Sequence, residues 1–161
     1  MVRTSSPIRV GVTGALAAAL VFGASACAST QTQHYYGASD GTRITLDSGT
    51  IEVVNLMVVV DDDNTGYLLG AVHNDSRGAE TATLTAADSG LSLQVDLGPG
   101  ATTNFTTDTE PPTLPTVAVP AGGNLIVTVS DAQGVSADVA VPVVDGSLPE
   151  YADFLATVSD A

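Results

Sequence analysis

The stretch IEVVNLMVVVDDDNTGYLLGAVHN, residues 51–74, holds two apolar runs separated by DDDNTG. Both runs are rich in Val and Leu and have the length of a β-strand. Asp and Asn hydrogen-bond to nearby backbone groups in turns, and we assign the positive φ that such a turn needs to Gly66. The stretch therefore predicts a β-hairpin, in which the acidic turn also discourages pairing between sheet edges.

The alternation of apolar runs and turns continues along the chain. Strand-like runs occur at residues 51–60, 67–74, 81–86, 91–97, 102–106, 116–119, 125–130 and 135–143. Turn sequences rich in Gly, Pro, Asn and Asp separate them. In LSLQVDL, residues 91–97, apolar and polar side chains alternate, which is typical of a strand with one buried and one wet face. We predict an all-β domain, an antiparallel β-sandwich of seven to eight strands.

Residues 1–26 have the organisation of an export signal. Arg3 and Arg9 precede the apolar run VGVTGALAAALVF, and small residues follow it. Because a membrane-spanning helix needs about 20 apolar residues, this run is too short to remain in the bilayer as one. We therefore expect export and removal of this segment.

The expected cleavage site lies directly before the only cysteine of the chain. Ala24, Ser25 and Ala26 form an A-x-A site, and Cys27 follows. A triplet of small residues before cysteine resembles the lipobox of bacterial lipoproteins, in which the cysteine becomes the acylated mature N-terminus. We expect lipidation of Cys27, and the alternative is a secreted protein that begins at the same residue without lipid.

The charge balance limits the partners. After loss of the signal, two arginines and 18 acidic residues remain, a formal charge of −16, and there is no lysine. Such a surface repels nucleic acid and anionic headgroups, so we expect no nucleic-acid partner. The acyl chains on Cys27 are expected to hold the protein at the outer, extracytoplasmic face of the cell membrane. The composition, rich in Ala, Val, Thr, Asp and Gly, is typical of a GC-rich genome such as that of an actinobacterium.

The mature length of about 135 residues suits one domain with a real core. We divide the chain into a signal peptide (1–26), a flexible polar tether (27–43), a β-sandwich (44–145) and a C-terminal tail (146–161). The tail is expected to be loose or to form a single helical turn.

The layout of the strands has a counterpart in a known family. IEVVNLMVVV, YLLGAVHN, TATLTAADS, VPAGGNLIVTV and ADVAVPVV before EYA together resemble actinobacterial lipoproteins related to the periplasmic PCuAC-type copper chaperones. The resemblance spans residues 44–153. It implies an immunoglobulin- or cupredoxin-like sandwich outside the cytoplasm.

The resemblance also implies where copper would bind. Chaperones of this family bind Cu(I) through two His and two Met, donors that suit this ion. Here His34 falls in the tether, and His73 is not at a ligand position of the family pattern. Met57 is expected to fill a gap in the core. We therefore expect no cofactor and no copper at the family site, and Met57 and His73 are only weak metal candidates.

The acidic turn resembles the first half of an EF-hand loop. Asp61 and Asp63 stand at positions 1 and 3, and Gly66 stands at position 6. Position 12 is Val72, which cannot supply the bidentate carboxylate, and the flanks are strands. Asp61 and Asp63 are thus weak calcium candidates, and we favour the turn.

No catalytic arrangement emerges from the sequence. His73, Asp75 and Ser76 are triad residue types, but neighbours in an extended chain point to opposite faces and cannot form a hydrogen-bonded line. We predict no enzyme but a non-catalytic, lipid-anchored module that binds or accompanies a cell-envelope protein. The alternatives are an extracytoplasmic copper-handling chaperone and an envelope hydrolase with an unrecognised carboxylate site.

Overall fold

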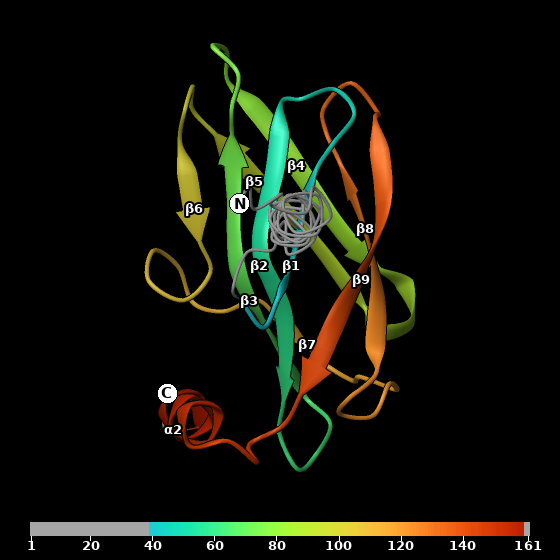
Figure 1. Ribbon diagram of the computed structural model, residues 1–161, viewed down its shortest axis with the longest axis vertical. Coiled ribbons are helices and arrows are strands. Elements are labelled where there is room, and N and C mark those ends of the chain that lie inside the picture. Colours follow the sequence, from blue (N-terminus) through green and yellow to red (C-terminus); the bar gives the residue numbers. More distant parts are fainter. Residues whose placement is uncertain (1–38, 160–161) are drawn as a thin grey trace, which may run out of the picture. The chain divides into compact units, whose positions relative to one another are not determined.

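The computed structural model describes residues 39–159 (Figure 1), so the export signal, Cys27 and His34 lie outside the described residues. In this range the elements are β1 (Thr42–Thr45), β2 (Ile51–Val60), β3 (Gly66–Asn74), β4 (Glu80–Ala86), a 3₁₀ turn (Ala87–Ser89), β5 (Leu91–Leu97), β6 (Thr102–Asn104), β7 (Thr113–Leu114), β8 (Asn124–Ser130), β9 (Ser136–Val144) and α2 (Pro149–Ser159). Between residues 39 and 159, no helical segment has the length and hydropathy of a membrane span.

The strands form two layers that share one strand. One layer contains β1, β2, β3 and β6, with β7 beside β3, and the other has the order β5-β4-β8-β9. Strand β9 joins them, because it pairs antiparallel with β8 and parallel with β2 over Val58↔Val143 and Val59↔Val144. The all-β sandwich predicted from the sequence is confirmed, with one short parallel pair in an otherwise antiparallel arrangement.

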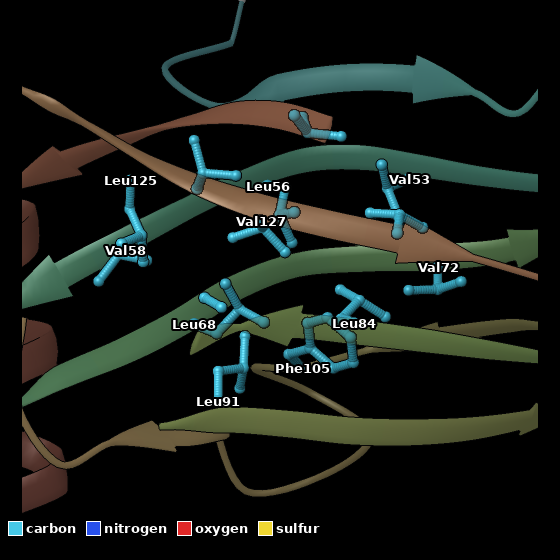
Figure 2. Packing of buried hydrophobic residues seen from close by; sticks show 14 of the residues in the cluster. Val53, Leu56, Val58, Leu68, Val72, Leu84, Leu91, Phe105, Leu125 and Val127 are labelled. Carbon is cyan, nitrogen blue, oxygen red and sulfur yellow. The ribbon is translucent and has the colours of Figure 1, made fainter. Parts of the chain in front are cut away.

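The core between the layers is built from alternate residues of each strand. Val53, Leu68, Val72, Leu84 and Val127 have no exposed surface, and Figure 2 shows them facing one another across the sandwich. Burying each such side chain contributes about 1.5–3 kcal/mol. A small domain with few aromatic residues thus obtains a continuous core from Val and Leu.

A bulge in β2 changes which residues face this core. Ile51 and Val53 point inward before it, and Leu56 and Val58 point inward after it, so the alternation shifts by one residue. Asn55 occupies the bulge with φ +54, a left-handed conformation that Asn accepts more readily than most residues.

Two glycines make room for the bulge. A Cβ at Gly70 would lie 2.7 Å from the backbone oxygen of Asn55, and one at Gly41 would lie 2.4 Å from its carbonyl carbon. The side chain of Asn55 also accepts a hydrogen bond from the backbone N–H of Gly41 (2.9 Å). The bulge therefore depends on glycine on both sides.

Three elements differ from the sequence prediction. Residues 116–119 are not a strand. Pairing with β3 is confined to Thr113–Leu114, and after Pro115 the backbone N–H of Val117 bonds to the oxygen of Asn64 (2.9 Å). Strand β1 was missed, since TRIT is short and lacks an apolar run. The C-terminal segment forms an 11-residue helix, longer than the expected single turn, because Tyr151, Phe154 and Leu155 pack against β2 and β3.

We predict that Gly70→Ala lowers the free energy of unfolding by about 1–3 kcal/mol, because Ala disfavours the φ of +123° and its Cβ meets Asn55. Urea unfolding followed by circular dichroism measures the change. Gly78→Ala is the matched control, since a Cβ there has nothing within 4 Å. Equal unfolding midpoints for the two variants would contradict this account of the bulge.

Candidate functional site

The carboxylate of Asp61 is a structural part of the acidic turn. Its Oδ1 accepts the backbone N–H of Asp63 (2.9 Å) and of Thr65 (2.8 Å). The positive φ belongs to Asn64 (+61°), so its assignment to Gly66 was wrong. Gly66 begins β3 and is needed for space, because a Cβ there would lie 2.5 Å from Cγ2 of Val117.

The turn between β8 and β9 repeats this hydrogen-bond pattern. Oδ1 of Asp131 accepts the N–H of Gln133 (3.0 Å) and of Val135 (2.9 Å), and Gly134 has the left-handed φ of +84°. Desolvation acts to raise the pKa of Asp131, but hydrogen bonds from Ser48, these two N–H groups and Thr50 outweigh it and hold the pKa below its usual value. The repetition identifies the first Asp of each turn as a cap for backbone N–H groups.

The three carboxylates of the first turn face an open cavity. Asp61, Asp62 and Asp63 line it together with Asp145, and it has a volume of about 580 Å³ beside α2. Within residues 39–159, no three His, Cys, Asp or Glu side chains are close enough together to hold a metal ion. The structure thus brings the two weak calcium candidates into one turn without completing a calcium site around them.

His73 lies on the outer face of the first layer. Its Nδ1 shares a hydrogen bond with Oγ1 of Thr102 (2.9 Å), its Nε2 is 3.9 Å from Oδ1 of Asp75, and its side chain is 28% exposed. On β2 its partner is Glu52, which forms an ion pair with Arg43 (2.5 Å). His73 on β3 therefore lies in a row of polar side chains that runs from β1 through β2 and β3 to β6. Its Nε2 is available to a ligand from solvent.

Met57 lies on the same face, but far from His73. It pairs with Leu69 in the β2–β3 ladder, four residues along β3 from His73, a separation of about 13 Å. Its side chain is 3% exposed, beneath α2, in a small cluster with Val59 and Tyr151 that is separate from the main core. Met57 is buried as expected, but the bulge places it outside the sandwich core.

Helix α2 closes this second cluster with aromatic side chains. Oη of Tyr151 donates to Oδ2 of Asp40 (2.6 Å). Burial, then the bond to Asp40 and the charges of Asp40 and Glu150, raise the pKa of Tyr151 to about 12. The rings of Phe154 and Tyr67 meet edge to face, with centroids 6.0 Å apart.

The residues around His73 serve structure. Asn74, fully buried, donates from Nδ2 to the backbone oxygens of Gly78 (2.8 Å) and Gly98 (2.9 Å). Ser76 donates its hydroxyl to Gly78 (3.0 Å), and so its proton is not directed at His73. The strand-ending Asn thus ties the loop after β3 to the end of β5.

Comparison with known proteins gives a likeness in fold. No family model matches the sequence, and no curated protein sequence is similar to it. Among solved structures, the apo PCuAC domain from PmoF1 is 12% identical with a TM-score of 0.53, over 65% of this chain and 99% of that domain. The apo PmoF2 PCuAC domain is 10% identical with a TM-score of 0.51, over 66% and 98%.

We predict that calcium stabilises the protein no more than sodium does at matched ionic strength, because the acidic turn gains only from screening. Asp61→Ala should lower the free energy of unfolding by about 1–2 kcal/mol, since two N–H groups lose their acceptor. Asp62→Asn should lower it by less than about 0.5 kcal/mol. Thermal unfolding with each salt measures both effects. A saturable, calcium-specific rise in Tm that Asp61→Ala abolishes would show that the turn is a binding site.

Proposed function

We propose that this chain is an extracytoplasmic copper-handling domain of the PCuAC type. The observation that carries the proposal is the likeness in fold, which extends over 99% of the PCuAC domain from PmoF1. The strand layout in the sequence resembles the same family. This likeness favours the copper-handling alternative over the metal-free module that the sequence led us to expect.

The donor chemistry of the chain indicates which residue to test. Cu(I) prefers thiolate, thioether and imidazole ligands. Of the residues that the structure describes, His73 offers such a donor at the surface, whereas Met57 is covered by α2. We propose that His73 binds copper, and that further donors come from His34, which precedes the described residues, or from the molecule that exchanges copper with this protein.

A second candidate is an accessory module that binds an envelope protein and no metal. The separation of about 13 Å between Met57 and His73 favours it. Tight Cu(I) sites usually join several soft donors at one point, and these two donors do not meet. The two candidates share the expected location outside the cytoplasm and differ in whether the chain itself carries copper.

We predict that the full chain binds one equivalent of Cu(I) in an anaerobic titration against a chromophoric chelator. His73→Gln should weaken the affinity at least about tenfold, since even outer partners of metal ligands contribute 10- to 100-fold. Met57→Leu, a change of similar volume at a covered position, is the control and should leave the affinity unchanged. Absence of stoichiometric copper in the wild type would overturn the first candidate in favour of the second.

We propose further that Cys27 anchors the protein to the membrane. The A-x-A triplet before the lone cysteine supports this, and two or three acyl chains hold firmly, because each buried methylene contributes about 0.8 kcal/mol. Cys27→Ser should move the protein from the membrane fraction to the medium or leave it as precursor. Ser25→Ala keeps a small residue at the site and should remain anchored. A soluble wild type without lipid in mass spectrometry would refute the anchor.

A further inference from the structure

Within the described residues, helix α2 supplies most of the side chains that cover the thioether of Met57. The strip formed by Met57, Val59 and Leu69 lies on the outer face of β2 and β3, where the neighbouring residues of the same face are partly exposed. Among residues 39–159, the side chains that pack on this strip come from α2, namely Tyr151, Phe154 and Leu155, and from Val144 at the end of β9. Figure 1 shows α2 after the end of β9, at one end of the sandwich. Access to Met57 therefore depends on the position of this helix.

Few side chains hold α2 in place. Tyr151 is the only buried residue of the helix, and Phe154 and Leu155 are half-buried against the strip. The free energy of local opening rises with the apolar area that must be exposed, so a helix held by three side chains opens more readily than strands of the main core.

Open space surrounds the helix. Cavities of about 580, 300 and 670 Å³ each have α2 residues in their walls, with Ala152 and Leu155 in the first, Tyr151 in the second and Phe154 in the third. On these sides α2 therefore faces solvent-filled clefts instead of neighbouring side chains.

Helix α2 is joined to β9 by a short segment, and one side-chain hydrogen bond also holds it to the segment before β1. The segment of residues 145–148, DGSL, joins β9 to α2 and includes Gly146, with Leu148 half exposed (51%). The tie is the hydrogen bond from Oη of Tyr151 to Oδ2 of Asp40, which belongs to the segment before β1. This bond links the first turn of α2 to the segment before β1.

We propose that α2 is a lid over Met57, with a hinge at residues 145–148 and with the Tyr151–Asp40 hydrogen bond as its latch. In the closed state the thioether is shielded. When the latch breaks, the lid swings out and exposes Met57 together with the apolar strip, while the sandwich stays folded. This inference does not depend on copper binding, since it concerns the access of an oxidant to the sulfur.

The reactivity of Met57 toward hydrogen peroxide tests the lid. One peroxide transfers an oxygen atom to the sulfur, which gives methionine sulfoxide and water. The rate is measured on the full chain by mass spectrometry of the peptide that contains Met57. Tyr151→Phe and Asp40→Ala should each raise this rate about fivefold or more, because each removes the same charge-assisted hydrogen bond. The double variant should be no faster than the faster single variant, since one bond is lost in all three.

Two controls separate lid opening from unfolding. Tyr67→Phe keeps the ring that packs against Phe154 and removes a hydroxyl outside the latch, so its rate should equal that of the wild type. Hydrogen exchange of the β8 amides, in the main core, should stay unchanged in Tyr151→Phe. Unchanged oxidation in both latch variants, or faster oxidation matched by faster β8 exchange, would overturn the proposal.

Discussion

The left-handed backbone of Asn55 is the constraint on which the rest of this structure depends. A shift of one residue in a strand moves every following side chain to the opposite face. Because of the bulge, β2 directs Ile51 and Val53 into the sandwich from one half and Leu56 and Val58 from the other. The residues between them then face outward, where they form the strip under α2. One unusual φ angle thus creates both the main core and the second cluster.

Polar groups in this protein mainly stabilise the backbone. Asp61 and Asp131 cap equivalent turns, and Asn74 ties the loop after β3 to the end of β5. Buried or partly buried polar atoms need such partners, since an unsatisfied one costs more than a hydrogen bond gains. A strongly acidic composition is therefore compatible with few sites for chemistry. His73 differs from these residues, because Nε2 is not used by the backbone.

The sequence predicted the fold better than the site, for physical reasons. The period-two pattern of LSLQVDL and of the runs around the acidic turn reflects burial of alternate side chains. Burial decides that these segments form strands and which side chains point into the core, and the sandwich follows from both. The sequences of strand β1 (TRIT) and of α2 did not predict these elements, because their stability comes from packing against β2 and β3 and not from local propensity. The position of Gly66 in the turn suggested a positive φ. A glycine is needed there instead because the side chain of Val117, distant in sequence, leaves no space for a Cβ. The distance between Met57 and His73 also depends on the bulge, because the bulge sets which residue of β3 lies opposite Met57. The sequence indicated this bulge only through Asn55, a polar residue inside an apolar strand.

The hydrogen bond between Tyr151 and Asp40 joins the first turn of α2 to the segment before β1, so the beginning of the described range lies beside its last helix. Domains with adjacent ends can be inserted into loops of other proteins, or joined end to end and reopened elsewhere, with little strain. The turns at residues 46–50 and 75–79 lie at the other end of the sandwich from α2 (Figure 1). Insertion of the domain through its adjacent ends would therefore leave both of these turns exposed.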